Sequence, residues 1–194
     1  MTRAGAPPAD AAGGSWPLFA AVRVPRRVAQ VLLTLARASH DGRDPVRWVD
    51  PADVHVTLWF IGRVEVEALP GLRIRLAQVA AGARPFTARI DGAGTFGSGR
   101  RRATWIGMAE PGAGRLQALA HDLRADPFTP HITVVRGAPA ALATVLSGRL
   151  VEHRLATGSL AWRTTRLELL RTRPGARPAY QTVAAFRLGR RAAT

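Results

Sequence analysis

Two short segments of the chain share one pattern: His55–Leu58 and His131–Val134 both read His, apolar, Thr, apolar. Both lie in runs rich in β-branched residues, which favour strands. Successive side chains of a strand point to opposite faces, so each segment places its His and Thr on one face and its apolar residues on the other. Two such strands in one chain predict a site in which two imidazoles face each other.

The size and composition of the chain predict one compact domain. With 194 residues, 47% of them hydrophobic, the chain can bury a sizeable core. The absence of cysteine excludes disulfides and thiolate metal sites, and no apolar run is long enough for a transmembrane helix. We expect residues 1–15 to be a disordered tail, 16–189 a single domain and 190–194 a C-terminal tail. Residues 1–15 lack the apolar core of a signal peptide, so we expect a cytoplasmic protein.

The charge of the chain is strongly positive, and arginine supplies all of the positive side chains other than histidine. The net charge is +15, with 28 arginines and no lysine. This charge favours attraction to phosphates, although a chain rich in Ala, Arg, Gly and Pro can also reflect its coding composition. The absence of lysine excludes a P-loop and any lysine nucleophile.

The spacing of apolar residues predicts alternating helices and strands, an α+β fold with mostly antiparallel sheets and helices on their outer faces. A Gly-rich loop is expected over residues 92–102, where it carries Arg100, Arg101 and Arg102, either as a solvated loop or as part of an RNA-binding rim. The expected strands cover residues 18–24, 54–61, 86–90, 104–108, 131–136, 166–170 and 180–188, and the expected helices cover 26–39, 69–82, 116–123 and a short stretch at 142–146.

Two longer segments carry a family resemblance. Residues 47–62 and 127–136, which contain the two His-x-Thr motifs, resemble the motif regions of the 2H phosphoesterases. More narrowly they are similar to the RNA 2′,3′-cyclic phosphodiesterases, also called 2′-5′ RNA ligases. The resemblance implies two pseudosymmetric lobes of mostly antiparallel sheet around a central cleft. One departure is that residues 125–128 form a shorter segment than the family usually has.

The resemblance also implies an activity. The expected reaction is metal-independent hydrolysis of RNA 2′,3′-cyclic phosphate termini to 2′-phosphomonoesters, together with its reversal as 2′-5′ RNA ligation. Two imidazoles suit this reaction because one can activate water while the other protonates the departing ribose oxygen. By resemblance His55 is the general acid and His131 the general base, although the residues alone leave the two roles open. The alternative is a non-catalytic nucleotide- or RNA-binding module that uses the same cleft.

Further site residues are expected around the phosphate. Thr57 and Thr133 would donate hydrogen bonds to its oxygens, and the resemblance implies that Arg136 contacts it too. Arg136 lies five residues after His131, on the opposite face of a regular strand, so a bulge or the strand end must turn it inward.

The sequence also gives predictions for base-stacking residues, partners and metals. Phe19 and Trp48 are the candidates for base stacking, because the resemblance places them near the cleft. The expected partners are RNA ends or nucleoside 2′,3′-cyclic phosphates, with no membrane and no obligate protein partner. No carboxylate or third His has ligand spacing with the two motif histidines, so we expect no metal and no other cofactor.

Overall fold

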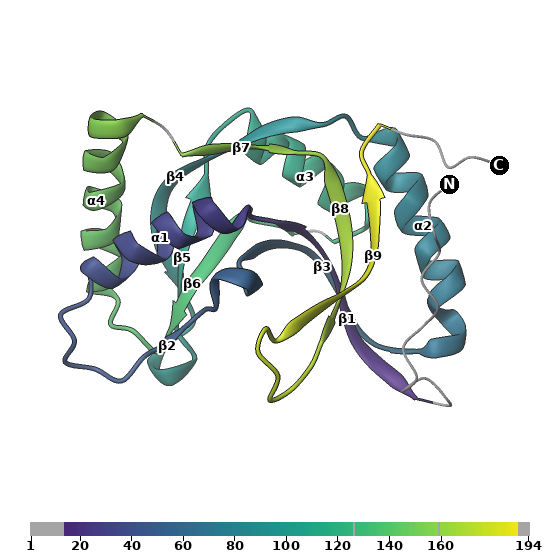
Figure 1. Ribbon diagram of the computed structural model, residues 1–194, viewed down its shortest axis with the longest axis horizontal. Helices are drawn as coiled ribbons and strands as arrows, with labels where there is room; N and C mark the ends of the chain where they lie inside the picture. The colour runs from purple at the N-terminus through teal and green to yellow at the C-terminus, as the bar shows by residue number, and fades with distance from the viewer. Residues whose placement is uncertain (1–13, 126, 159, 190–194) are drawn as a thin grey trace.

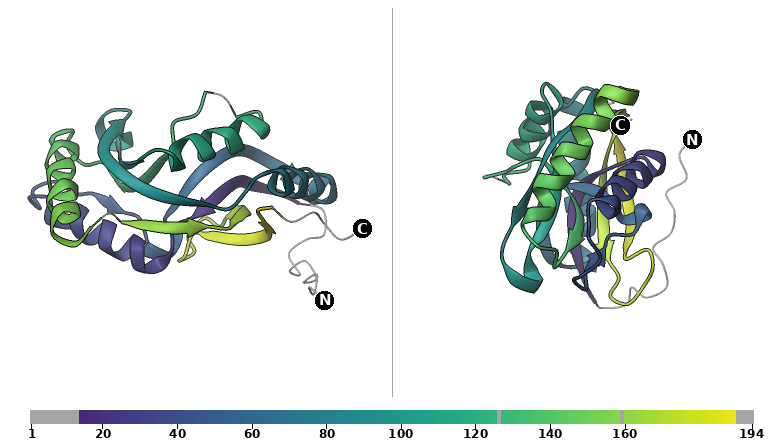
Figure 2. Two further views of the ribbon diagram at one scale, coloured as in Figure 1. Left: turned by 90° about the horizontal axis from the view of Figure 1, so that it is seen from above. Right: turned by 90° about the vertical axis from the view of Figure 1, so that its left-hand side faces the viewer.

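The structure, a computed structural model, describes residues 14–125, 127–158 and 160–189. Its strands form two antiparallel sheets, and its helices gather around them, with α1 and α4 at one end of the molecule and α2 at the other (Figures 1 and 2). The expected α+β class and two-sheet architecture are therefore confirmed. The predicted tails at residues 1–13 and 190–194 lie outside the described residues, whereas Ser15, assigned to the N-terminal tail, begins the first strand.

The first sheet has the strand order β3-β1-β8-β9 and the second the order β2-β6-β5-β4-β7. The strands are β1 (Ser15–Arg23), β2 (Arg47–Trp48), β3 (His55–Glu65), β4 (Phe86–Phe96), β5 (Ala103–Met108), β6 (His131–Arg136), β7 (Ala161–Thr164), β8 (Arg166–Thr172) and β9 (Tyr180–Arg187). The helices are α1 (Arg26–Ala38), α2 (Leu69–Gly82), α3 (Gly112–Asp122) and α4 (Ala141–Thr157), with short 3₁₀ turns η1 (Pro51–Asp53), η2 (Val66–Ala68) and η3 (Gly99–Arg101).

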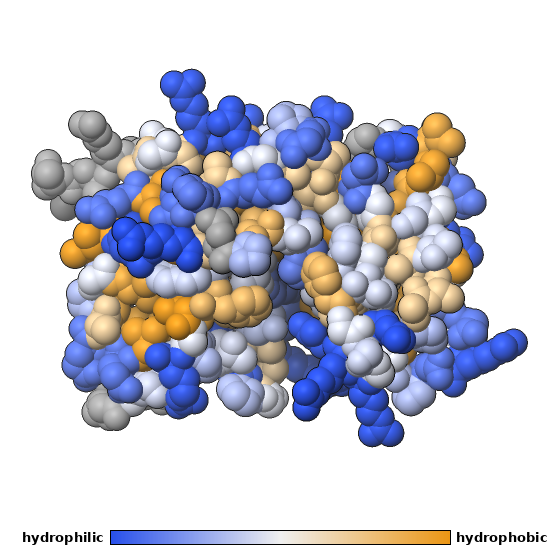
Figure 3. All heavy atoms as spheres, turned by 180° about the vertical axis from the view of Figure 1, so that it is seen from behind, coloured by the Kyte–Doolittle hydropathy of each residue, from blue (hydrophilic) through white to orange (hydrophobic). Residues whose placement is uncertain are grey.

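The helices form because each has an apolar stripe to bury. In α1 the buried residues follow helical spacing, namely Val28, Ala29, Leu32, Leu33 and Ala36. Helix α1 packs on β6 and α4 on β4, both in the second sheet, whereas α2 packs on β8 and β9 in the first. None of the described helices is long and apolar enough to cross a membrane. Hydrophilic side chains dominate the face shown in Figure 3, with smaller apolar patches between them.

The two motif strands lie in different sheets and contact each other. Their apolar residues face the core as expected: Val56, Leu58, Ile132 and Val134 are each at most 2% exposed. Each strand therefore keeps its His and Thr on the face away from the core. This arrangement turns the two His-x-Thr faces toward the space between the sheets.

Each motif strand also contains a bulge at the fourth position of its motif. In β3 the register against β1 shifts so that Leu58 is the extra residue, since Thr57 pairs with Ala21 and Trp59 with Ala20. In β6 the pairing with β5 jumps from Thr133 to Val135. A bulge reverses the alternation of faces.

The bulges determine which later residues share the His faces. Phe60 and Arg136, each five residues after a motif histidine, line the same cavity as the histidines. The bulge in β6 thus supplies the inward turn that the sequence required for Arg136, and the bulge in β3 does the same for Phe60.

The expected Gly-rich loop at residues 92–102 is wrong in its first half, because β4 continues to Phe96. Gly92, at φ +61°, lies where the β4–β5 register shifts, so it forms a bulge within the ladder. Gly94 lies against Trp105, and a Cβ at this position would come within 2.4 Å of the indole ring. These glycines serve strand pairing and close packing.

Other differences concern the extent of the elements. Strand β3 continues past Gly62 to Glu65, and α4 has 17 residues where only a short helix was expected. The short edge strands β2 and β7 were not expected; with two and four residues they are too short to leave a periodic signal.

Candidate active site

A cavity of about 270 Å³ lies between the two sheets and is lined by residues from both. It brings together six of the predicted site residues: Phe19, His55, Thr57, His131, Thr133 and Arg136. Two segments 76 positions apart in sequence thus contribute equivalent side chains to one space. The polar residues predicted for the site therefore contribute two imidazoles, two hydroxyls and one guanidinium to this cavity, which Asp53, Thr172 and Tyr180 also line.

His55 is held in one orientation by its own backbone neighbourhood. Its Nδ1 lies 2.6 Å from the carbonyl oxygen of Asp53, and its Nε2 lies 2.9 Å from Thr57 Oγ1. A carbonyl oxygen can only accept a hydrogen bond, so Nδ1 carries the proton. Nε2 is then the nitrogen left for Thr57 and for a ligand in the cavity.

Two aromatic rings pack against His55, and burial lowers its pKa. Its ring centroid lies 5.0 Å from that of Phe19 and 5.1 Å from that of Tyr180, which meets it edge-on. Burial lowers the pKa of His55 from 6.5 to about 4; the Asp53 carbonyl opposes this shift, and the positive charge of Arg23 adds to it. In the free protein the His55 imidazole is therefore neutral at pH 7.

His131 is held in the same way on the second sheet. Its Nδ1 donates to the carbonyl oxygen of Thr129 at 2.8 Å, again two residues earlier in the chain. Phe96 meets the His131 ring edge-on at 4.9 Å, and Trp105 lies at 6.3 Å. Both motif histidines thus have a carbonyl at Nδ1 and two aromatic neighbours.

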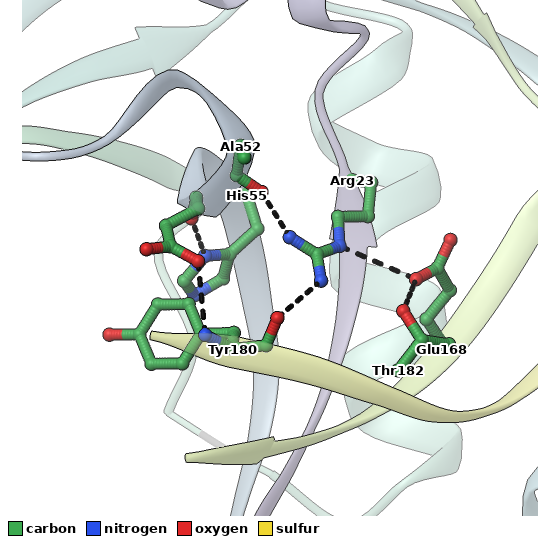
Figure 4. Close-up of polar contacts among 7 residues, drawn as sticks. Arg23, Ala52, His55, Glu168, Tyr180 and Thr182 are labelled. Carbon is green, nitrogen blue, oxygen red and sulfur yellow. Dashed lines mark hydrogen bonds and ion pairs between the residues drawn. The ribbon is translucent and has the colours of Figure 1, made fainter. Parts of the chain in front are cut away.

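A network of hydrogen bonds and an ion pair around Arg23 connects the elements on the His55 side of the cavity. Arg23 donates to the carbonyl oxygens of Ala52 and Tyr180, the latter at 3.2 Å, and forms an ion pair with Glu168 at 3.4 Å. Thr182 donates to the same Glu168 oxygen at 3.0 Å. Figure 4 shows the Arg23 guanidinium between these groups, beside His55. Arg23 therefore joins η1, β8 and β9 at the edge of the site.

Asp53 completes the connection between η1 and β9. Its side chain is 5% exposed, and its two carboxylate oxygens accept hydrogen bonds from the backbone N–H groups of Ala179 (2.7 Å) and Tyr180 (3.0 Å). Because the backbone carbonyl of the same residue fixes Nδ1 of His55, Asp53 positions both the imidazole and the Tyr180 ring beside it.

Replacing Asp53 by Asn is expected to lower the free energy of unfolding by about 1–3 kcal/mol. An amide offers only one accepting oxygen, so one of the two part-buried N–H groups, that of Ala179 or that of Tyr180, loses its partner. Chemical denaturation would measure the loss. Asp50→Asn is the matched control: Asp50 Oδ1 accepts from the Ala52 N–H at 2.8 Å, and an Asn oxygen caps equally well, so this variant should be near neutral.

The two residues predicted to stack on a base, Phe19 and Trp48, lie in different surroundings. Phe19 lines the cavity, but it is 4% exposed and its ring packs against His55, Tyr180 and Phe60. Trp48 is not brought to the cavity; its ring is met edge-on by His40 at 5.9 Å and covered by the Arg37 guanidinium at 5.6 Å.

The three consecutive arginines also lie outside the cavity lining. Arg100 and Arg101 are exposed on η3, and Arg102 donates to the Ala138 carbonyl at 3.3 Å.

Sequence reasoning missed several residues of the site. Phe60 was missed because strand parity places it on the wrong face unless the bulge is known, and Asp53 because its partners are backbone groups 126 and 127 positions away. Tyr180, the only tyrosine of the chain, could have been noticed by that fact alone. Within residues 14–125, 127–158 and 160–189, no three His, Asp or Glu side chains come together as metal ligands would.

Two sheets that present paired His-x-Thr strands to one cavity define a phosphoesterase of the two-histidine type. Comparison with known proteins agrees: residues 22–105 match the model of the LigT like Phosphoesterase family. The chain is 32% identical over 137 residues to the RNA 2′,3′-cyclic phosphodiesterase of Escherichia coli K12, covering 64% of this chain and 74% of that protein. The chain therefore belongs to the LigT-like phosphoesterase family, as the motifs predicted.

Other relatives and solved structures extend the comparison. The RNA 2′,3′-cyclic phosphodiesterase of Geobacillus stearothermophilus is 33% identical over 161 residues, 73% of this chain, which spans about half (47%) of that protein's length. A crystal structure of a Thermus thermophilus protein superposes with a TM-score of 0.69 at 25% identity, covering 89% of this chain and 98% of the other. E. coli LigT complexed with phosphate has the same fold, with a TM-score of 0.67 at 24% identity and coverages of 91% and 99%.

Proposed function

We propose that this chain hydrolyses RNA 2′,3′-cyclic phosphate termini to 2′-phosphomonoesters, with His55 and His131 as the proton-transfer pair. The observation that carries the proposal is the equivalence of the two imidazoles. Each is held at Nδ1 by the carbonyl two residues earlier, so each offers Nε2 to one cavity. The curated relatives in E. coli and G. stearothermophilus bear the name of this activity, which supports the same reaction here.

In the proposed reaction His131 acts as the base and His55 as the acid. Nε2 of His131 takes a proton from water, and the water oxygen attacks phosphorus. The bond between phosphorus and the ribose O3′ breaks as His55 Nε2–H protonates O3′, leaving the phosphate on O2′. With an RNA 5′-hydroxyl in place of water, the same steps form a 2′-5′ phosphodiester.

The other polar groups of the cavity would hold the phosphate during this exchange. The hydroxyls of Thr57 and Thr133 can donate to its non-bridging oxygens, and the Arg136 guanidinium can form a charge-assisted pair with them. These contacts fix the phosphorus between the two imidazoles, the arrangement that in-line displacement needs.

The low pKa of His55 links its protonation to substrate binding. A general acid must be protonated, yet His55 is neutral at pH 7 in the free protein because of its burial. A phosphodiester anion beside Nε2 favours the charged form of the imidazole and raises its pKa. The substrate thus brings the counter-charge that the acid role requires.

A non-catalytic nucleotide- or RNA-binding module is the weaker interpretation of the same cavity. Such a module needs hydroxyl and guanidinium donors for the phosphate, but it has no use for two oriented imidazoles on opposite sides. A cytoplasmic location, RNA as the natural substrate and a single domain over residues 16–189 remain predictions from the sequence.

The decisive test is hydrolysis of a nucleoside 2′,3′-cyclic phosphate in the presence of EDTA. We expect turnover to continue and the product to be the 2′-monophosphate, identified by chromatography against both isomers. Loss of activity in EDTA with recovery on adding zinc or magnesium would contradict the two-histidine mechanism. Formation of the 3′-monophosphate would show that O2′ leaves instead and would reverse the proposed orientation of the ribose.

A further inference from the structure

Arg23 lies directly beside His55, the proposed acid, although it does not line the cavity. The register of the first sheet pairs Arg23 of β1 with His55 of β3, and residues directly opposite on neighbouring strands share a face. The pair before them, Val22 and Val56, is buried in the core, so Arg23 and His55 lie on the other side of the sheet, toward the cavity. A permanent positive charge therefore stands next to an imidazole that must itself become positive to act as an acid.

The Arg23 guanidinium holds the backbone at two points around this imidazole. It donates to the carbonyl oxygen of Ala52 and, at 3.2 Å, to that of Tyr180. The next carbonyl of η1, that of Asp53, accepts from His55 Nδ1, and the Tyr180 ring packs edge-on against the imidazole. Figure 4 shows the guanidinium between Ala52 and Tyr180. Arg23 thus acts on the orientation of His55 through both of its supports.

Glu168 of β8 compensates the Arg23 charge only in part. Its Oε2 lies 3.4 Å from Arg23 Nε, which is longer than a typical hydrogen bond, and the same oxygen accepts from Thr182 at 3.0 Å. The two side chains of this ion pair are only 23% and 15% exposed, so water screens their charges less than it does at the surface. His55 therefore experiences a positive charge that Glu168 weakens but does not cancel.

The charged and titratable groups around the neighbours His55 and Arg23 come from five elements. They are Arg23 on β1, Asp53 on η1, His131 and Arg136 on β6, Glu168 on β8 and Tyr180 on β9. Burial is the main reason why the pKa of His55 is lowered to about 4, and among the charged groups Arg23 has the largest effect, ahead of Asp53 and His131. The contacts and the charges thus indicate the same residue.

We propose that Arg23 is a positioning residue for the proposed acid, and that its ion pair with Glu168 sets how strongly the site opposes protonation of His55 before substrate binds. The inference rests on the proposed function. Arg23 holds Nε2 of His55 toward the cavity through η1 and β9, and its charge keeps the imidazole neutral while the cavity holds no anion. Glu168 keeps this opposition small enough for a bound phosphate anion to overcome, because opposite charges offset each other.

The first measurement follows the His55 ring by NMR as the pH of the free protein is lowered from about 7.5 to about 3.5. The His55→Asn variant identifies its signal among the five histidines. Glu168→Gln should move the titration midpoint to lower pH by about 0.5–1, because the Arg23 charge loses its counter-charge while the amide oxygen can still accept from Arg23 and Thr182. Arg23→Met should move the midpoint to higher pH, because the positive charge is gone.

Asp91→Asn is the matched control, because it removes the carboxylate of another ion pair, with Arg154 at 3.6 Å, outside the cavity. It should leave the midpoint unchanged. Midpoints of Glu168→Gln and Arg23→Met that stay in place or move in the same direction would overturn the proposal. Should Arg23→Met fail to fold, as judged by circular dichroism, the Glu168→Gln result decides alone.

The second measurement links the protonation of His55 to the reaction. It compares kcat/KM at pH 7 on adenosine 2′,3′-cyclic phosphate and on a mononucleotide p-nitrophenyl ester, whose leaving group needs no proton. Glu168→Gln should lower the value for the cyclic phosphate by about three- to tenfold and change that for the ester little, because a smaller fraction of His55 is protonated. Arg23→Lys should keep the midpoint but lower kcat on the cyclic phosphate by about tenfold or more, since an ammonium cannot reproduce the planar fork that holds both carbonyls.

The ion pair and the proposed activity can fail separately. If the unaltered protein hydrolyses neither compound, the proposed function is wrong, while the NMR titration still decides whether the pair controls protonation of His55. A midpoint that moves in Glu168→Gln without any loss of kcat/KM on the cyclic phosphate would overturn the role of the pair in the reaction. Full turnover of the cyclic phosphate by Arg23→Lys would overturn the positioning role.

Discussion

Replacing either His55 or His131 by alanine is expected to reduce turnover of a nucleoside 2′,3′-cyclic phosphate by about 10²- to 10⁴-fold, the usual contribution of general acid–base catalysis. Both variants should remain folded, because each imidazole makes only one hydrogen bond to the backbone. His153→Ala, on α4 and outside the cavity, is the matched control and should keep full turnover. Near-normal rates in either motif variant would contradict the proposed pair.

A second substrate separates the acid from the base. In a mononucleotide p-nitrophenyl ester the leaving group departs as a stable anion and needs no proton. If His55 is the acid, His55→Ala should lose far less activity on this ester than on the cyclic phosphate. His131→Ala should lose activity on both substrates, because the water still needs a base. The reverse pattern would exchange the two roles.

The pH dependence of the reaction should be bell-shaped, because one imidazole must be neutral and the other charged in the reactive complex. Such a profile belongs to the pair and does not identify either residue. The two alanine variants resolve this ambiguity. His131→Ala, which lacks the proposed base, should lose the fall in rate at low pH. His55→Ala, which lacks the proposed acid, should lose the fall in rate at high pH.

The motif strands were predictable because their side-chain pattern repeats with the period of a strand. His55, Thr57, His131 and Thr133 share a face for the same reason that Val56 and Ile132 are buried. The mostly antiparallel sheets were expected from the run of elements, whereas the pseudosymmetric lobes around a central cleft came from the family resemblance. Nothing in local periodicity indicates which strands become neighbours when β1 pairs with both β3 and β8.

What the sequence did not reveal are features created by pairing or by distant contacts. The bulges at Leu58 and Val134 arise from register shifts against β1 and β5, so the single strands carry no sign of them. They decide that Phe60 and Arg136 line the cavity. The glycines of β4 were misassigned to a loop for a related reason, because Gly94 is required by Trp105 on the neighbouring strand. The Asp53 carboxylate is likewise explained only by the backbone of β9.

Acid is expected to destabilise this protein through His55. The pKa of this imidazole is about 4 in the folded protein, because of burial, against 6.5 in the unfolded chain. Between these values the unfolded chain binds a proton that the folded protein does not, so the free energy of unfolding falls as the pH is lowered. The contribution is fully present above pH 6.5 and is lost on the way down to about pH 4. A difference of this size corresponds to about 3 kcal/mol.

The comparison that isolates this contribution is between the unaltered protein and His55→Asn. An Asn side chain can still donate to the Asp53 carbonyl but does not titrate. Urea unfolding at pH 7, 5.5 and 4 should show a steeper loss of stability in the unaltered protein, with the difference growing as the pH falls. His153→Asn, outside the cavity, should retain the steep dependence. Parallel curves for the unaltered protein and His55→Asn would show that His55 titrates alike in both states, and the link between substrate binding and protonation of the proposed acid would then lose its basis.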